Sequence, residues 1–349
     1  YPQWFECFQR GAPHAHQQPQ ARIGLLFIGE GDKTLEEASL ISLAENHSTS
    51  GQMAKASADN LLPALKQLLE SGCDSIVPLM TGDRLAPHAL DHLSGLLSDG
   101  NAWGYADCDR DGAQGERSLP WLKPVWDVDL FIGADIFTPG AIFSAAIINK
   151  ALALLSPADE LRSLSWHYLI AGIALATEKN QTTVAHLPQV LYHRSQQSPA
   201  SPEQAAPSSD RLQAIAWLCD CLVPGATVSA LPDFPALLHT QWPLPETLPR
   251  VSLIVPTRDQ YTLLHTCIEG LLNDTDYPDL EIIVVDNQSS DPQTLAYLAE
   301  LPGRGVKVLP HPYPFNYSTI NNSAVAHATG EVIGLVNNDI EIIEAGWLK

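Results

Sequence analysis

Residues 251–259 read Val-Ser-Leu-Ile-Val-Pro-Thr-Arg-Asp, and residues 280–289 read Leu-Glu-Ile-Ile-Val-Val-Asp-Asn-Gln-Ser. Each stretch is a short apolar run that ends in polar residues, which predicts a buried strand followed by a turn. Residues 306–309 and 332–336 form two further apolar runs, and residues 261–272, 292–301 and 318–329 between the runs have helical spacing. Continuous apolar strands that alternate with helices indicate an α/β fold with a parallel sheet covered on both faces.

Polar side chains follow three of these strands. Residues 257–259 (Thr-Arg-Asp) follow the first, residues 286–291 follow the second, and residues 337–339 (Asn-Asn-Asp) follow the fourth. Ligands of parallel sheets bind at the carboxyl ends of the strands, so we expect a ligand site there. Taken alone, Asp286 is also consistent with an Asx turn or a helix cap, and residues 337–339 with an ordinary turn.

The turn after the first strand decides between two kinds of nucleotide site. Residues 256–260 contain no glycine, which argues against a dinucleotide site, and the chain has no P-loop. A nucleotide-sugar site fits better, because Asp286 can accept hydrogen bonds from a base or ribose. Asn337 and Asp339 can present oxygen atoms to Mg²⁺ or Mn²⁺, which would neutralise charge on a leaving nucleoside diphosphate.

Four segments together resemble, in order and spacing, the family-2 glycosyltransferases with the GT-A fold. They are residues 251–259, 282–289, 314–322 (Pro-Phe-Asn-Tyr-Ser-Thr-Ile-Asn-Asn) and 330–341 (Gly-Glu-Val-Ile-Gly-Leu-Val-Asn-Asn-Asp-Ile-Glu). The resemblance implies a nucleotide-sugar-binding set of Pro256, Thr257, Arg258, Asp259, Asp286, Asn287, Ser289, Asn322 and Asn338. It also implies that residues 337–339 are the DxD metal motif of the family. Asn337 in its first position is a variant of rhamnosyltransferase-like members, and it leaves Asp339 as the stronger ligand of a divalent cation.

Residues 76–194 resemble the later half of the same fold, with residues 22–31 as its first strand. The DxD positions fall on Met80 and Gly82, which leaves only the neighbouring Asp83. No carboxylate lies at residues 165–168, where the family carries its catalytic base; His167 is either a replacement base or an ordinary packed or surface histidine. We therefore expect residues 1–194 to form a degenerate glycosyltransferase-like domain.

The remaining boundaries follow from composition. Residues 195–250 contain a Ser/Pro-rich linker, a short helix and a proline-rich extended connector. Residues 251–349 then correspond to the nucleotide-binding half of a second module. We expect both chain ends to be cuts, the catalytic base to lie beyond Lys349, and this fragment to be inactive alone.

The net charge of −21 over 349 residues argues against binding to nucleic acid. The six cysteines are scattered and include no pair of pairs at zinc spacing, which favours reduced thiols in the cytoplasm. The chain shows no signal peptide, and its longest apolar stretch, residues 141–148, is too short to span a bilayer. We expect a soluble cytoplasmic protein, with peripheral association at the inner membrane face as a second possibility.

The sequence therefore supports a transferase hypothesis: a metal-assisted, inverting transfer of a sugar from a nucleotide-sugar donor. The acceptor would be a glycan or lipid-linked saccharide in cell-surface polysaccharide or O-antigen-type synthesis, activated by a carboxylate base. The alternative is a non-catalytic tandem scaffold that binds a glycan or a partner. In a third hypothesis the first copy supplies the acceptor half for the second, against which the missing carboxylate near His167 argues.

Overall fold

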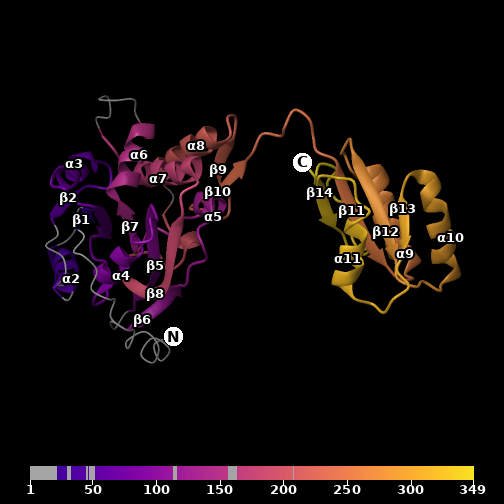
Figure 1. Ribbon diagram of the computed structural model, residues 1–349, viewed down its shortest axis with the longest axis horizontal. Coiled ribbons are helices and arrows are strands. Elements are labelled where there is room, and N and C mark those ends of the chain that lie inside the picture. Colours follow the sequence, from indigo (N-terminus) through magenta and orange to yellow (C-terminus); the bar gives the residue numbers. More distant parts are fainter. Residues whose placement is uncertain are drawn as a thin grey trace. The chain divides into compact units, whose positions relative to one another are not determined.

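The computed structural model describes residues 22–29, 33–44, 46, 52–112, 116–155, 163–206 and 208–349, and the chain forms two units (Figure 1). The first unit extends to Pro243 and the second begins at Leu244. Residues 1–21 of the expected first domain, with Cys7 among them, lie outside the described residues. So do the last two positions of the strand expected over residues 22–31.

The first unit is built on an eight-stranded sheet. Its strands are β1 (Ile23–Ile28), β2 (Met53–Ala56), β3 (Ser75–Met80), β4 (Arg84–Leu85), β5 (Trp103–Asp111), β6 (Arg117–Trp121), β7 (Ala141–Ser144) and β8 (Val184–Arg194). The order is β2-β1-β3-β7-β5-β8-β4, with β6 paired to β5. The pairs β1–β2, β1–β3 and β5–β8 are parallel, and the others are antiparallel. This sheet is therefore mixed, whereas a mostly parallel sheet was predicted, because short connections such as the one between β5 and β6 join antiparallel neighbours.

Helices cover both faces of this sheet. They are α2 (Lys33–Leu43), α3 (Leu62–Glu70), α4 (Ala89–Gly95), α5 (Val128–Gly133), α6 (Ala145–Leu155), α7 (Trp166–Asn180) and α8 (Ser209–Leu222). Side chains alternate along β1, so that Leu26 and Ile28 join the core with α3 and α7. Leu25 and Phe27 join the core on the other face with α4.

The segment predicted as a linker and connector is largely part of the first unit. After β8, Ser195 N–H donates to Asp83 Oδ1 at 2.7 Å, and Ala200 C=O accepts from Trp121 Nε1 at 3.2 Å. Helix α8 adds Ile215 and Leu218 to the same buried cluster as α7. Strands β9 (Thr227–Ala230) and β10 (Leu238–Gln241) then form an antiparallel hairpin. The first unit therefore includes residues 195–243 of the segment that was predicted as linker and connector.

The second unit is the predicted parallel sheet. Its strands are β11 (Val251–Thr257), β12 (Leu280–Asp286), β13 (Lys307–Pro310) and β14 (Val332–Leu335), in the order β13-β12-β11-β14, and every pair is parallel. Its helices are α9 (Tyr261–Glu269), continued by a π-helical turn (Gly270–Asp274), α10 (Pro292–Glu300), followed by a 3₁₀ turn (Leu301–Arg304), and α11 (Tyr317–Val325). Leu253 and Val255 pack beneath α9 and α10, and Ile254 packs against α11. The prediction of a sheet covered on both faces is confirmed for this unit.

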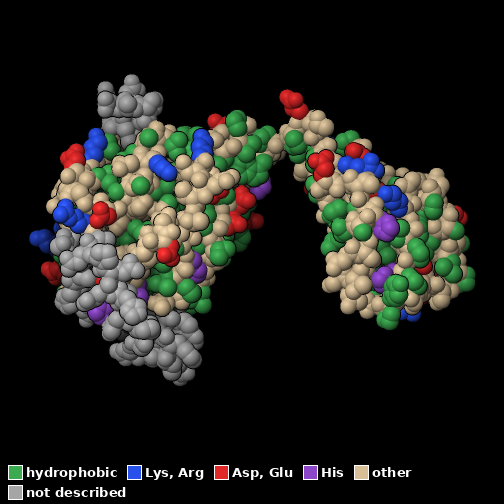
Figure 2. Space-filling view, in the orientation of Figure 1, with side chains coloured by type: hydrophobic (Ala, Val, Ile, Leu, Met, Phe, Trp, Pro, Cys, Tyr) green, Lys and Arg blue, Asp and Glu red, His purple; other side chains and the backbone are tan. Residues whose placement is uncertain are grey.

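On the face drawn in Figure 2, Lys and Arg side chains lie scattered among Asp and Glu and form no continuous basic stripe.

Candidate functional site

The carboxyl ends of β11, β12 and β14 lie next to one another in the second unit. Thr257, the last residue of β11, is in register with Asp286, the last residue of β12. On the other side of β11, Val336 N–H donates to Ile254 C=O at 2.9 Å, which brings the turn after β14 to the same edge. Parallel pairing therefore gathers the three predicted polar segments at one place.

The turn after β11 is held by Asp259. Its backbone N–H donates to Ser289 Oγ at 2.8 Å, and its Oδ1 accepts from the N–H groups of Ser290 at 2.6 Å and Asp291 at 2.8 Å. These two hydrogen bonds to the carboxylate lower the pKa of Asp259, and the bond from Asp291 N–H has the larger effect. Asp259 and Gln260 both have left-handed backbone angles, with φ of 54° and 61°. The Asp259 carboxylate thus links the loops after β11 and β12.

Asp286 also bonds within its own loop. Its Oδ1 accepts from Ser289 N–H, three residues further on, at 2.9 Å, and Gln288 between them has a left-handed φ of 63°. An Asx turn would bond to the N–H two residues on. Among the described residues, Asp286 Oδ2 makes no hydrogen bond. The turn therefore uses one carboxylate oxygen and leaves the other for a further partner.

Asn287 directly follows β12 and is buried, with 1% of its surface exposed. Its Nδ2 donates to the carbonyl groups of His311 at 3.0 Å and Tyr313 at 2.8 Å, which fixes the chain that leaves β13. Its Oδ1 is buried and accepts no hydrogen bond from the described residues. A buried unpartnered acceptor is costly, so this atom marks a position where a donor from a bound group would be favourable.

The turn after β14 carries residues 337–339. Asn338 Nδ2 donates to Thr257 Oγ1 at 3.0 Å, which ties this turn to the end of β11. The side chains of Asn337 and Asp339 are exposed. Neither makes a hydrogen bond or ion pair through its side chain with the described residues, so their oxygen atoms are accessible.

A cavity of about 250 Å³ opens at this edge. It is lined by Pro256, Thr257, Arg258, Gln260, Asn287, Phe315, Tyr317, Ile320, Asn337 and Asn338. Six of the predicted binding residues are in this set. Five are not: Asp259, Asp286, Ser289, Asn322 and Asp339. The first three of these form the loop bonds described above, and Asn322 is exposed on α11.

Four lining side chains were missed as site residues: Gln260, Phe315, Tyr317 and the buried Ile320. Phe315 and Tyr317 belong to the aromatic run Tyr-Pro-Phe-Asn-Tyr at residues 313–317, and both are exposed. Large aromatic side chains that remain exposed beside polar turns are a usable signal for a binding surface. Gln260 gave no such signal, because its position depends on the left-handed turn.

Arg258 supplies the positive charge of the cavity. Among the described residues it forms no ion pair, and no other Lys or Arg lines the cavity. No carboxylate lines it either. The described residues contain no group of three His, Cys, Asp or Glu side chains placed to hold a metal ion.

The corresponding edge of the first unit differs in its chemistry. Asp83, which follows β3, is buried and accepts from Tyr192 Oη at 2.7 Å and from Ser195 N–H at 2.7 Å, with Ser198 Oγ at 3.3 Å. Burial raises the pKa of Asp83, although these bonds act in the opposite direction. The side chain is therefore enclosed rather than presented to a ligand.

The end of β8 shows the same pattern. Asp109 Oδ1 lies 2.6 Å from His193 Nδ1 and accepts from Arg117 Nη1 at 3.1 Å. Arg84 and Arg117 both pair with Asp111. Burial lowers the pKa of His193. Arginine side chains thus neutralise the carboxylates of this edge from within the fold.

Comparison with known proteins gives a family match for the second unit. Residues 252–349 match the family model of Glycosyl transferase family 2. The chain is 32% identical over 270 residues to the O-antigen biosynthesis protein RfbC of Myxococcus xanthus, covering 76% of this chain and 20% of that protein. It is 31% identical over 253 residues to the uncharacterized protein y4gI of Sinorhizobium fredii, covering 70% of this chain and 27% of that protein. The chain therefore spans 20% and 27% of the lengths of these curated relatives, and both matches reach into the first unit.

Among solved structures, a mannosyltransferase from Pyrobaculum calidifontis in complex with GDP-Man and Mn²⁺ is 29% identical. The match covers 30% of this chain and 31% of that chain, with a TM-score of 0.27. In the part of the chain that the structure describes, no helix is long and apolar enough to cross a membrane. Residues 252–349, which hold the parallel sheet of the second unit, are thus the part of this chain that is similar to glycosyl transferase family 2.

Proposed function

We propose that the second unit binds the nucleoside diphosphate part of a nucleotide-sugar donor in the cavity at the ends of β11, β12 and β14. The observation that carries this proposal is that one cavity is lined from all three sides by the predicted residues, from Thr257 and Arg258 through Asn287 to Asn338. The family match over residues 252–349 supports it.

The side chains of the cavity suit the parts of such a donor. The Arg258 guanidinium can bind phosphate oxygens in a bidentate manner. The rings of Phe315 and Tyr317 offer apolar surface on which a nucleobase can stack. The buried Asn287 Oδ1 can accept a hydrogen bond from a donor group of the ligand.

A divalent cation fits the turn after β14. Asn337 and Asp339 present oxygen atoms, and Mg²⁺ or Mn²⁺ accepts one or two protein oxygens together with a diphosphate. When bound, the cation would neutralise the charge of the departing nucleoside diphosphate. Asn338 would keep the turn in place through its bond to Thr257, and Arg258 would bind the phosphates beside it.

For the whole protein we propose an inverting sugar transfer to a glycan or lipid-linked acceptor in polysaccharide or O-antigen-type synthesis. The support is the match to the O-antigen biosynthesis protein of M. xanthus. Because no carboxylate lines the cavity, we assign the general base to none of the lining residues.

The direct test is calorimetric titration of the chain with UDP, GDP and dTDP in the presence of Mn²⁺. Asp286→Asn keeps an acceptor for Ser289 N–H while removing the charge, and Asp339→Ala removes the stronger proposed metal ligand. We expect each to weaken binding by about tenfold, since charged contacts to ligands contribute at this level. Asp279→Asn, an exposed position before β12, is the matched control. Unchanged binding in both site variants would overturn the proposal.

We also propose that the first unit is a degenerate relative of the same module. In the first unit, the parallel strands lie in the order β2-β1-β3, and in the second unit the order is β13-β12-β11-β14. Strand β1 thus takes the position of β11, between its two parallel neighbours, and the first unit has no strand in the position of β13. Asp83 is enclosed, and Asp109 and Asp111 are paired with arginine side chains, so these three carboxylates are not presented to a cation. We expect a stoichiometry of one nucleoside diphosphate per chain. Two equivalent sites would contradict this proposal.

The alternative is a non-catalytic scaffold in which both units only bind glycans or partners. It predicts no nucleoside diphosphate binding even with Mn²⁺ at millimolar concentration. The same titration therefore separates the two functions.

A further inference from the structure

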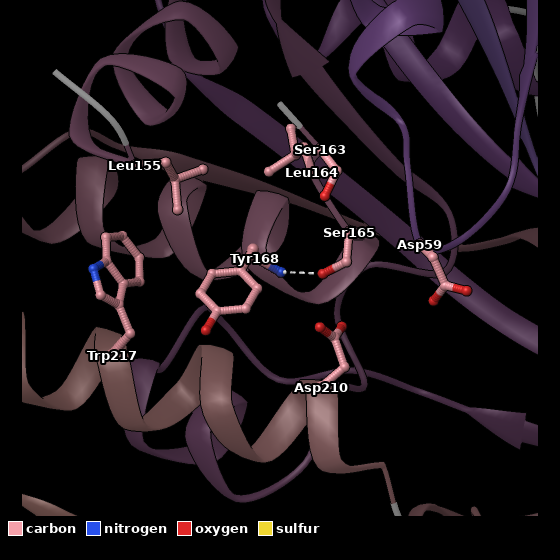
Figure 3. A pocket seen from close by; sticks show the side chains of 8 residues that line it. All are labelled: Asp59, Leu155, Ser163, Leu164, Ser165, Tyr168, Asp210 and Trp217. Carbon is pink, nitrogen blue, oxygen red and sulfur yellow. Dashed lines mark hydrogen bonds between the residues drawn. The ribbon is translucent and has the colours of Figure 1, made fainter. Parts of the chain in front are cut away.

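A second cavity lies in the first unit, within the part of the chain assigned no activity above. It has a volume of about 370 Å³ and opens at the start of α7, beside α8 and the turn after β2 (Figure 3). It is lined by Asp59, Leu155, Ser163, Leu164, Ser165, Tyr168, Asp210 and Trp217. Its size is that of a site for a small organic molecule.

Two helix starts bring its polar groups together. Ser165 caps α7 by accepting from Tyr168 N–H at 3.4 Å, so Tyr168 lies in the first turn of that helix. Ser208 caps α8, which places Asp210 in the first turn of α8. The ring of Trp217, two turns further along α8, lies 6.3 Å from the ring of Tyr168. Figure 3 shows both rings and the Asp210 carboxylate around the cavity.

Several polar groups of the cavity are available. Among the described residues, the Tyr168 hydroxyl, the Trp217 indole N–H and the Asp59 carboxylate make no hydrogen bond, and Asp59 is exposed. Burial, and then the charge of Asp210, raise the pKa of Tyr168, so its hydroxyl remains a donor. The cavity therefore offers donors, acceptors and aromatic surface at once.

The same set excludes some ligand classes. Among the described lining residues there are two carboxylates and no Lys or Arg, a composition that disfavours a phosphate or another anion. An ammonium ligand would need an uncompensated carboxylate inside the site. The Asp210 carboxylate is already hydrogen-bonded to the His167 imidazole, with Oδ2 2.9 Å from Nδ1, and the Asp59 carboxylate is exposed to solvent, which screens its attraction for a cation. A neutral ligand rich in hydroxyl groups fits best.

We propose that this cavity binds one residue of a saccharide. The apolar face of a pyranose ring would pack on Trp217 and Tyr168, and its hydroxyl groups would donate to Asp59 and Asp210. The Tyr168 hydroxyl and the Trp217 N–H would donate to ring or hydroxyl oxygens. This site belongs to the first unit alone and does not depend on the proposed donor site.

The pair with Asp210 also explains His167. The imidazole lies beside α8 and holds the Asp210 carboxylate, which makes His167 a positioning residue for the saccharide site. The sequence analysis left two alternatives open for His167, a replacement base or an ordinary packed or surface histidine.

The test is saturation-transfer NMR on the whole chain with methyl glycosides of glucose, galactose, mannose, rhamnose and N-acetylglucosamine. We expect at least one of them to receive saturation. Trp217→Ala and Asp59→Asn should each weaken its binding by about tenfold. The matched controls are Trp242→Ala and Asp99→Asn, exposed positions of the first unit outside the cavity, which should bind as the unchanged chain does.

Three results would overturn the proposal. One is the absence of saturation transfer to every glycoside. Another is full retention of the signal in both cavity variants. The third is displacement of the glycoside by UDP with Mn²⁺ or by choline, which would assign the signal to the donor site or to a cation site. A circular dichroism spectrum and a thermal unfolding transition of the first unit like those of the unchanged chain would show that Trp217→Ala is folded.

Discussion

Arg258 is the residue whose charge should matter most to ligand binding in the second unit. It lines the cavity and has no ion-pair partner among the described residues. A guanidinium–phosphate bond contributes about 1.5–3 kcal/mol, so Arg258→Ala should weaken nucleoside diphosphate binding by about tenfold or more. Calorimetry at two salt concentrations should also show a weaker salt dependence for the variant. Arg250→Ala is the control, because Arg250 precedes β11 at the opposite end of the sheet and pairs with Asp279. An equal loss in both variants would contradict a specific role for Arg258.

Asn287 should matter to stability as well as to binding. Asn287→Ala removes the donors to two carbonyl groups, those of His311 and Tyr313, inside a buried loop. Leaving buried acceptors without donors costs about 1–3 kcal/mol, and urea unfolding should show a loss of that size. The control Asn273→Ala, at an exposed asparagine bonded to Glu269, should change the free energy of unfolding by less than about 0.5 kcal/mol. A loss at Asn287 no larger than at Asn273 would show that these bonds do not hold the loop.

At the scale of elements, β12 carries a buried carboxylate at its amino end that should make the second unit sensitive to acid. Burial acts to raise the pKa of Glu281, but hydrogen bonds from Lys307, Ser252 and Thr329 outweigh it and lower the pKa to about 2. A pKa below the ordinary 4.5 means stabilisation that is complete above pH 4.5 and is lost as the pH falls toward 2.

Glu281→Gln should therefore destabilise the unit by about 1–3 kcal/mol at pH 7, and the gap between the two proteins should narrow at pH 3. Urea unfolding at both pH values measures it. A gap that does not depend on pH would assign the loss to packing instead of charge.

The elements of the second unit could be predicted closely, because period and composition are local properties. Two helix ends could not. Helix α9 gives way to a π-helical turn at Gly270, where a Cβ would approach Ile342 Cγ1 to 2.9 Å, so a contact 72 positions away sets that end. Helix α11 ends at Val325, and Thr329 N–H then donates to Glu281 Oε2 at 2.8 Å. The same holds for the site. The parallel pairing of the strands predicted where Asp259 and Asp286 lie, but it did not predict that their carboxylates accept hydrogen bonds from backbone N–H groups of the loop after β12.

For the whole molecule, the boundary between the units was the hardest feature to predict. The Ser/Pro-rich composition of residues 195–210 suggested a free linker, yet Asp83 and Trp121 bind it through contacts more than 70 positions apart in sequence. The mixed order of the first sheet depends on long-range pairing in the same way, since β7 enters between β3 and β5. The local composition of a segment does not predict such long-range contacts.

Each unit has its own buried clusters, and this predicts two separable unfolding transitions. Unit one is held by the clusters around β1, α3 and α7, and unit two by those around β11 and α9. A ligand at about 100 times its Kd stabilises the unit that binds it by about 2.7 kcal/mol, so UDP with Mn²⁺ should shift only the transition of the second unit.

Trp347 is the tryptophan of the second unit, and the other seven precede residue 244. In a Trp347→Phe variant, fluorescence would therefore report the first unit while circular dichroism reports both. The expected result is a fluorescence midpoint that UDP leaves unchanged beside a dichroism transition that it raises. A single transition that moves in both signals would show that the two units unfold together.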